Sequence, residues 1–267
     1  MPRVSVNGVE LYYEEHGEGL PVLGIHGTPS SAMLWEDPAA ELAKIGRCII
    51  YDRRGFHRSE RPEPFTAVDL ADHVDDAAAL LDALSATPAA VIGRSTGGEI
   101  ALALAHRYPE KVTALVLLEP AVFWLDAKAQ AWAGQLRDLV LEVAATDPHA
   151  AAAAVIRQVM GDQLWEALPG ELRTMFDNTS PAVLAEIRGD GLDLSETPPA
   201  LGPAELAGVR GPVLLVSAED SPGVLRRVNA RLAELLPAAE NVLVPGGHLI
   251  NPAHPTVLDF LRRFTGA

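Results

Sequence analysis

The sequence contains very little cysteine, because Cys48 is the one cysteine among 267 residues. A single cysteine cannot form a disulfide within the chain, so the fold does not depend on an oxidising compartment. Cys48 lies in a short apolar run and is expected to be a buried strand thiol. Aromatic residues are also few, at 5%, but the hydrophobic fraction of 48% is enough for a full core and excludes intrinsic disorder.

Basic residues are too few for a nucleic-acid-binding protein. Lys and Arg number 21 against 36 Asp and Glu, which gives a formal net charge of −15. Nucleic acids and anionic membrane surfaces both require clustered Lys and Arg, and the sequence has no basic run. We therefore expect no nucleic-acid partner and no membrane partner, but a small molecule that is neutral or weakly polar.

The sequence also lacks long apolar segments. No run reaches the roughly 18 residues of a membrane-spanning helix, and the first residues, MPRVSVNGVELYY, lack the apolar core of a signal peptide. We expect a cytoplasmic protein. No cluster of His, Cys and carboxylates has metal-ligand spacing, so no metal is expected. The sequence leaves open whether the chain is a monomer or a homo-oligomer.

Short apolar runs alternate with helical patterns at both ends of the chain. After a hairpin at Asn7-Gly8, strands are predicted at 21–25, 48–51, 89–92, 112–118, 212–217 and 241–244. Helices are predicted between and after them at 38–45, 67–84, 96–107, 224–236 and 255–264. Because the strands are continuously apolar, the pattern indicates a parallel sheet covered on both faces.

The middle of the chain shows helical patterns and no convincing strand. Helices are predicted at 127–145, 149–160, 169–178 and 181–188, followed by a Pro/Gly-rich linker at 189–211. We therefore predict one α/β core made of residues 1–121 and 210–267, with a helical insertion at 122–209.

The strongest motif is Gly93-x-Ser95-x-Gly97, between a predicted strand and a predicted helix. This is the sequence context of a nucleophile elbow, a turn so tight that small residues must flank the nucleophile. It presents the Ser95 hydroxyl above the edge of the sheet. It also points the backbone N–H of Thr96 into the site, where it can stabilise an oxyanion.

A serine nucleophile needs a base, and His248 is the best-placed histidine. It follows a predicted strand in Pro245-Gly246-Gly247-His248, late in the chain. Near the start, Gly27 and Thr28 follow another strand, and the Thr28 N–H can supply a second oxyanion donor. His26 is expected to brace this loop, and His73 is expected on a helix surface.

These pieces together resemble the α/β-hydrolase fold superfamily over nearly the whole chain. The matching segments are HGTP at 26–29, DRRGFHRS at 52–59, GRSTGG at 93–98, AHRYPEKVTALVLLEP at 105–120 and PGGH at 245–248. The resemblance implies an eight-stranded, mostly parallel sheet with a helical cap after the sixth strand, which is where 122–209 falls. It also implies a triad in the chain order nucleophile, acid, histidine.

The triad acid has two candidates. The family pattern usually places an Asp after the strand at 212–216, but an ungapped alignment puts Ser221 there and leaves Asp220 one residue early. The alternative is Glu119, at the end of the strand 112–118, where some haloalkane dehalogenases and zearalenone-type lactonases have their acid. Glu119 is preferred and Asp220 remains open.

His57 is a second departure from the family, since it replaces a glycine of D-x-R-G-x-G-x-S. It is either a substrate contact or a plain loop residue. Three of the four tryptophans, Trp124, Trp132 and Trp165, fall in the predicted cap, where they are candidates for lining an apolar pocket of medium size.

The combined features predict acyl transfer by a serine hydrolase, with a neutral ester or lactone as substrate. No cofactor is expected, because the Gly-rich turn carries a serine where a dinucleotide site needs bare amides. Two alternatives remain. One is a cofactor-free relative with other chemistry, such as C–C bond hydrolysis, perhydrolysis or a tailoring cyclisation. The other is a non-catalytic small-molecule receptor, because fold alone does not decide function.

Overall fold

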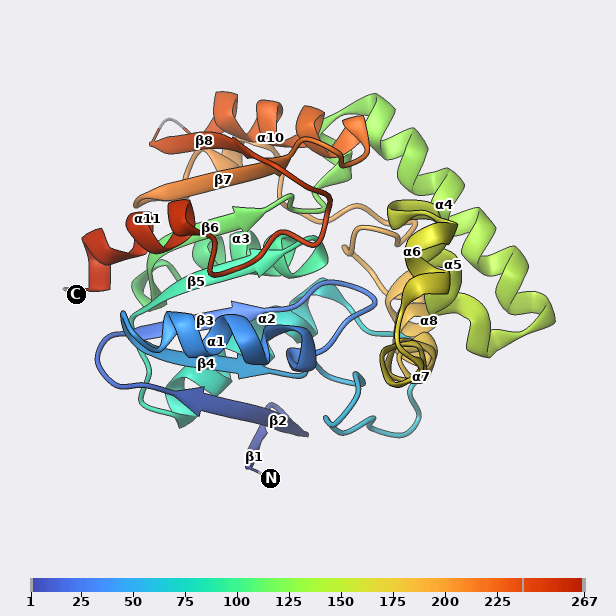
Figure 1. Cartoon of the computed structure of the whole chain (residues 1–267), viewed down its shortest axis with the longest axis horizontal. Helices are drawn as coiled ribbons and strands as arrows, with labels where there is room; N and C mark the ends of the chain where they lie inside the picture. Colours follow the sequence, from blue (N-terminus) through green and yellow to red (C-terminus); the bar gives the residue numbers. More distant parts are fainter. Residues whose placement is uncertain (1, 237, 266–267) are drawn as a thin grey trace.

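An eight-stranded sheet forms the centre of the computed structural model, which describes residues 2–236 and 238–265 (Figure 1). The spatial order of the strands is β1-β2-β4-β3-β5-β6-β7-β8. Strand β2 pairs antiparallel with β1 and with β4, and all the other neighbouring strands pair in parallel. The strands are β1 (Arg3–Val6), β2 (Val9–His16), β3 (Pro21–Ile25), β4 (Arg47–Tyr51), β5 (Ala89–Arg94), β6 (Val112–Leu118), β7 (Val213–Ala218) and β8 (Ala239–Val244).

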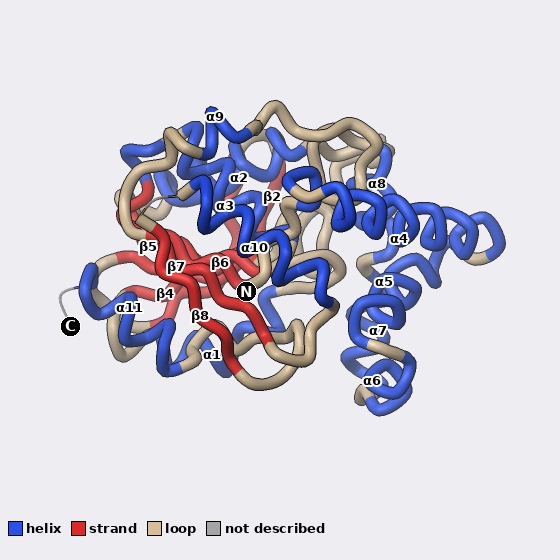
Figure 2. Tube along the Cα trace, turned by 90° about the horizontal axis from the view of Figure 1, so that it is seen from above, coloured by secondary structure: helices blue, strands red, loops and turns tan. Residues whose placement is uncertain are grey.

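Helices cover both faces of this sheet (Figure 2). The side chains of α1 (Glu36–Leu42) and α11 (Pro255–Thr265) share one apolar core with one face of the strands. Those of α2 (Leu70–Ala83), α3 (Thr96–Arg107) and α10 (Gly223–Leu235) belong to the core on the other face. Every residue of β5 and β7 is buried, as continuous apolar strands of a parallel sheet must be. The predicted fold class is confirmed.

Between β6 and β7 the described chain forms helices, turns and loops. Figure 1 shows most of these helices gathered at one end of the sheet. The elements of this segment are η3 (Phe123–Leu125), α4 (Ala127–Thr146), η4 (Pro148–Ala150), α5 (Ala151–Met160), α6 (Asp162–Ala167), α7 (Gly170–Asn178), α8 (Ser180–Arg188) and α9 (Pro203–Leu206). The remaining short 3-10 helices are η1 (Ala32–Trp35) and η2 (Pro109–Lys111).

The structure differs from the sequence prediction at short elements and at several element boundaries; for example, the helix predicted at 38–45 spans Glu36–Leu42. The helices α6 and α9 were not predicted, because six and four residues are too few to show a helical period. The helix predicted at 67–84 begins at Leu70, since Asp69 and Asp72 form a capping box there. No helix in the described ranges combines the length and apolarity that crossing a membrane requires.

Candidate active site

Ser95 occupies the sharp turn between β5 and α3. Its φ of +55° lies in the left-handed region, which is costly for a residue with a side chain. The neighbouring glycines make the turn possible. A Cβ on Gly93 would overlap the backbone of Gly97, and a Cβ on Gly97 would overlap the carbonyl of Ile25. Local sequence therefore explains why the serine is held at the carboxyl end of the sheet.

Glu119 and His248 are in direct contact. Nδ1 of His248 lies 2.7 Å from Oε2 of Glu119, and both side chains are buried. Glu119 directly follows β6 and also has a positive φ, +46°. Its other oxygen, Oε1, accepts a hydrogen bond from the backbone N–H of Ala218 at 2.9 Å. This arrangement holds Nδ1 of the ring to a carboxylate, and Nε2 has no hydrogen-bond partner among the described residues.

Asp220, the other candidate acid, borders a small hollow beside His248 but forms no hydrogen bond or ion pair with His248 among the described residues. Its side chain is exposed, and its backbone N–H donates to the carbonyl of Gly246 at 2.9 Å. Ser221, the residue at the aligned family position, instead donates its hydroxyl to Oε2 of Glu119 at 2.7 Å. The alignment with the family pattern placed Ser221 at the position of the usual Asp, but it gave no reason to assign Ser221 a role.

The two candidate oxyanion donors both lie near Ser95. Thr96 is the first residue of α3, where backbone N–H groups have no intrahelical partner, and its hydroxyl donates to Asp193 at 3.1 Å. Thr28 lines the same pocket as Ser95 and His248. Between Thr28 and Ser95, a Cβ on Gly27 would lie 3.0 Å from the Ser95 Cβ, so this position needs glycine.

A buried polar cluster holds the Thr28 loop. The Thr28 hydroxyl donates to Oε2 of Glu186 on α8 at 2.6 Å and accepts a hydrogen bond from Arg53. Arg53 and His73 both contact Oε1 of Glu186. The pKa of Glu186 is lowered to about 2 by the Arg53 charge and the His73 contact, which outweigh its burial. The cluster joins the inserted helix α8 to the loop that carries a candidate oxyanion donor.

His73 is therefore not the surface residue expected from its helical pattern, since its side chain is 1% exposed. Burial and the nearby Arg53 charge lower its pKa. His26 is buried too, and its pKa lies well below the usual value for the same reasons. Its Nε2 accepts a hydrogen bond from the Arg53 N–H at 3.0 Å, and its Nδ1 lies 2.8 Å from the Gly27 carbonyl. This geometry fits a neutral ring that braces the loop.

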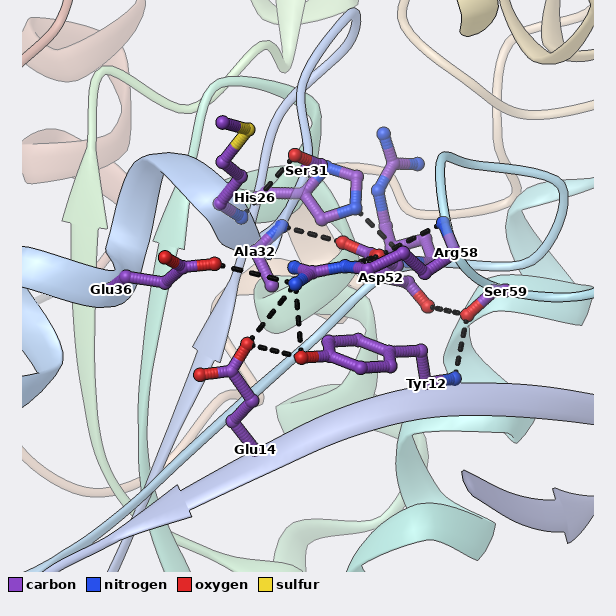
Figure 3. Close-up of polar contacts among 11 residues, drawn as sticks. Tyr12, Glu14, His26, Ser31, Ala32, Glu36, Asp52, Arg58 and Ser59 are labelled. Atoms are coloured by element: carbon purple, nitrogen blue, oxygen red, sulfur yellow. Dashed lines mark hydrogen bonds and ion pairs between the residues drawn. The ribbon is translucent and has the colours of Figure 1, made fainter. Parts of the chain in front are cut away.

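The segment DRRGFHRS anchors two loops to each other (Figure 3). The Asp52 carboxylate accepts hydrogen bonds from the Ala32 N–H at 2.7 Å and from the Arg58 guanidinium at 2.9 Å. Arg58 also donates a hydrogen bond to the Tyr12 hydroxyl at 2.9 Å, and the Ser59 hydroxyl accepts a hydrogen bond from the Tyr12 backbone N–H at 2.9 Å. The motif ties the loops after β3 and β4 to strand β2, so its role here is structural.

A pocket of about 40 Å³ lies over Ser95 and His248 and is called here the active-site pocket. That is room for only a few water molecules, less than the medium-sized pocket expected from the sequence. The inserted segment contributes mainly apolar side chains to it. They are Phe123, Trp132, Leu136, Val155, Ile156, Val159, Met160, Phe176 and Leu194.

Gly27, also proposed as a substrate contact, lines this pocket together with Trp132, whereas the remaining proposed contacts do not. Trp124 borders a separate hollow and donates its indole N–H to the carbonyl of Leu201 at 3.1 Å. Trp165 is 6% exposed and packs near Phe176. His57 is exposed and borders a different surface hollow, between the Arg58 loop and α7. The structure thus brings only Trp132, of the three tryptophans, to Ser95.

Two further carboxyl groups lie near the nucleophile turn, Glu99 within α3 and Asp193 in the lining of the active-site pocket, and the sequence gave no signal for either. Glu99 on α3 is fully buried, and burial together with the neighbouring Asp193 raises its pKa well above the usual value. Asp193 lies in the segment after α8. Burial, and the charge of Glu186, raise the pKa of Asp193 to about 7.

A family model described as alpha/beta hydrolase fold matches residues 21–255. The chain therefore belongs to this family of proteins, in agreement with its sheet order and its strand–turn–helix serine.

Several of its relatives are hydrolases, and others include a non-heme chloroperoxidase of Streptomyces lividans, 39% identical over 42% of this chain and 41% of that protein. The chain is 27% identical to 2-(acetamidomethylene)succinate hydrolase of Mesorhizobium japonicum, over 96% of this chain and 91% of that protein. It is 40% identical to 2-hydroxymuconate semialdehyde hydrolase of Pseudomonas sp. over 43% of this chain and 41% of that protein. The solved enol-lactonase of Burkholderia xenovorans shares its fold, with a TM-score of 0.74 at 23% identity, covering 97% of this chain and 99% of that one.

Proposed function

We propose that the chain is a serine hydrolase that cleaves a neutral, fairly apolar carboxylic ester or lactone through an acyl-enzyme. The observation that carries the proposal is the buried contact of 2.7 Å between Glu119 and His248, in a pocket that also contains the strained Ser95. A carboxylate on Nδ1 leaves Nε2 to accept a proton, which is the role of a general base beside a serine.

In this mechanism His248 takes the Ser95 proton as the hydroxyl oxygen attacks the carbonyl carbon. The negative charge that develops on the carbonyl oxygen is stabilised by the backbone N–H groups of Thr28 and Thr96. His248 then gives the proton to the leaving alkoxide, and the acyl group remains on Ser95. Water, deprotonated by His248, cleaves this ester and regenerates the enzyme. Glu119 keeps the ring in the required tautomer and stabilises its cationic form.

The inserted helices support the substrate class. We assign residues 122–209 as a cap whose apolar side chains bind the substrate, because they form most of the wall opposite Ser95. Since the pocket holds only about 40 Å³, its apolar side chains have to rearrange, or the substrate has to extend into the adjoining hollow of about 240 Å³. The excess of 36 acidic over 21 basic residues in the chain also favours a neutral ligand over an anionic one.

C–C bond hydrolysis is the second candidate. It is favoured by the 40% identity to 2-hydroxymuconate semialdehyde hydrolase, although that match covers less than half of either chain. Parallel assays with 4-nitrophenyl esters, lactones and a vinylogous diketone distinguish the two activities. Esters and lactones are cleaved at a C–O bond, whereas the diketone is cleaved at a C–C bond.

The decisive experiment is covalent labelling with a small fluorophosphonate, followed by intact-mass measurement and peptide mapping. The proposal expects one label per chain, located at Ser95, and no label in Ser95→Ala. A folded protein that stays unlabelled, at concentrations that label an esterase control completely, would refute the activated serine.

A further inference from the structure

Asp193 places a carboxyl group in an otherwise apolar part of the active-site pocket. It lies in the segment that returns from α8 towards β7 and lines the pocket together with Ser95 and His248. The mechanism proposed above does not use it. The neighbouring lining residues, Phe123 and Leu194, are apolar, so a carboxyl group has a high desolvation cost at this position.

Only one oxygen of this carboxyl has a side-chain partner among the described residues. Oδ2 accepts the Thr96 hydroxyl at 3.1 Å. Arg53, whose charge acts on Asp193, is already bonded to Glu186 and to the Thr28 hydroxyl and forms no ion pair with Asp193. The side chain is partly buried and lines the pocket, and its remaining hydrogen bond comes from the backbone N–H of Leu194.

That space extends to both sides of Asp193. Beyond the active-site pocket lies a second hollow of about 240 Å³, here called the side pocket, bordered by Trp124, Gln130 and Arg137. Phe123, Asp193 and Leu194 border both hollows. Asp193 therefore stands at the junction of the two hollows, and its carboxyl is hydrogen-bonded to Thr96, the residue next to the nucleophile.

We propose that Asp193 determines substrate specificity by accepting a hydrogen bond from a hydroxyl or N–H group that the substrate carries near its scissile carbonyl. The inference rests on the proposed function and narrows its substrate class to esters or lactones with such a donor. A buried acceptor discriminates strongly for the group that satisfies it, because an apolar analogue leaves the acceptor unpaired. The raised pKa of Asp193 does not oppose this, since a neutral carboxyl also accepts through its carbonyl oxygen.

The test compares pairs of esters that differ by a hydroxyl in place of a methyl group. Suitable pairs are 4-nitrophenyl 2-hydroxypropanoate with 2-methylpropanoate, and 4-nitrophenyl 3-hydroxybutanoate with 3-methylbutanoate. The readout is the ratio of kcat/KM within each pair, which a purely structural defect does not change. For at least one pair, this ratio is expected to fall about tenfold or more from the native enzyme to Asp193→Leu.

Two variants control the comparison. Asp193→Asn keeps an acceptor oxygen and is expected to keep most of the preference. Leu194→Ala enlarges the same wall without touching the carboxyl and is expected to change both members of a pair alike. If the ratios of the native enzyme and Asp193→Leu agree within twofold for both pairs, the inference is wrong although the hydrolase stands. If Ser95 is neither labelled nor active on any ester, the proposed function fails and the inference fails with it.

Discussion

Ser221 and Glu119 lie 102 positions apart in the chain, yet the Ser221 hydroxyl donates a hydrogen bond of 2.7 Å to the Glu119 carboxylate. The same oxygen of Glu119 contacts His248. In relatives with the usual motif, an Asp is expected where Ser221 stands. Here the carboxylate that contacts His248 is Glu119, at the end of β6. Ser221, after the end of β7, donates a hydrogen bond to that carboxylate.

This arrangement predicts that Glu119, and not Asp220, is needed for turnover. Glu119→Gln removes the charge that stabilises the histidine cation and is expected to lower kcat by roughly 10³–10⁴-fold. Asp220→Asn, on an exposed side chain, is expected to stay within about threefold of the native enzyme. Steady-state hydrolysis of a 4-nitrophenyl ester measures both. A crippled Asp220→Asn with an active Glu119→Gln would reverse the assignment.

The Ser221 contact also predicts a rescue. Because the Ser221 side chain already reaches Oε2 of Glu119, a carboxylate at position 221 is directed at the same histidine. The double variant E119Q/S221D is expected to recover at least about tenfold of the kcat lost in E119Q. Equal rates for the single and double variants would show that position 221 cannot carry the acid in this fold.

Substitution by alanine is predicted to have opposite effects at two glycines, one in the nucleophile turn and one in helix α4. Gly97→Ala forces a methyl group against the carbonyls of Ile25 and His26. We expect it to cost about 1–3 kcal/mol of unfolding free energy, and at least about 100-fold in kcat through displacement of Ser95. Gly134, in helix α4, has open space at its Cβ position, so Gly134→Ala is expected to stabilise the protein by about 0.5–1 kcal/mol. Thermal melts and ester assays of both variants test this; a harmless Gly97→Ala would contradict it.

The buried Glu186 cluster predicts a large loss of stability. Glu186→Gln leaves the Arg53 guanidinium buried without its carboxylate, which typically costs about 3–5 kcal/mol. Glu166 forms the matched exposed pair with Arg157, and Glu166→Gln is expected to cost less than about 1 kcal/mol. Urea denaturation gives both values. Similar losses in the two variants would show that the buried cluster contributes no more than a surface ion pair.

Asp193 predicts a pH-dependent effect on stability. Its pKa is about 7 in the folded protein and about 3.9 in an unfolded chain. Between these values the folded state holds a proton that the unfolded state has released, so the group lowers stability as pH rises from about 4 to 7. The neighbouring groups that act on it are Glu99, Glu186 and Arg53.

Asp193→Asn removes this titration. Its melting temperature relative to the native protein is expected to be higher at pH 8 than at pH 5. Asp138→Asn removes the same charge from a side chain that is 75% exposed, and its relative melting temperature is expected to stay constant. A difference for Asp193→Asn that does not change with pH would contradict the raised pKa.

The features predicted from sequence are those that neighbouring residues encode. The helix Thr96–Arg107 and the strand Val112–Leu118 have the predicted bounds, because uninterrupted apolar patterns and glycine turns are local signals. The same locality singled out Ser95 and His248 as candidates, each next to a strand end. Short helices such as Asp162–Ala167 lacked a detectable period, and the capping box at Asp69 moved a helix start by three residues.

By itself, the sequence determined the fold class, the strand–turn–helix around Ser95 and the two alternatives for the acid. Only the tertiary structure decided which side chains meet. It brought Glu119 to His248, Glu186 to Thr28 across 158 positions, and Asp193 to Thr96 across 97. The physical reason is that a parallel sheet gathers the carboxyl ends of distant strands at one edge, and an inserted helical segment can pack there in a position that no local pattern specifies.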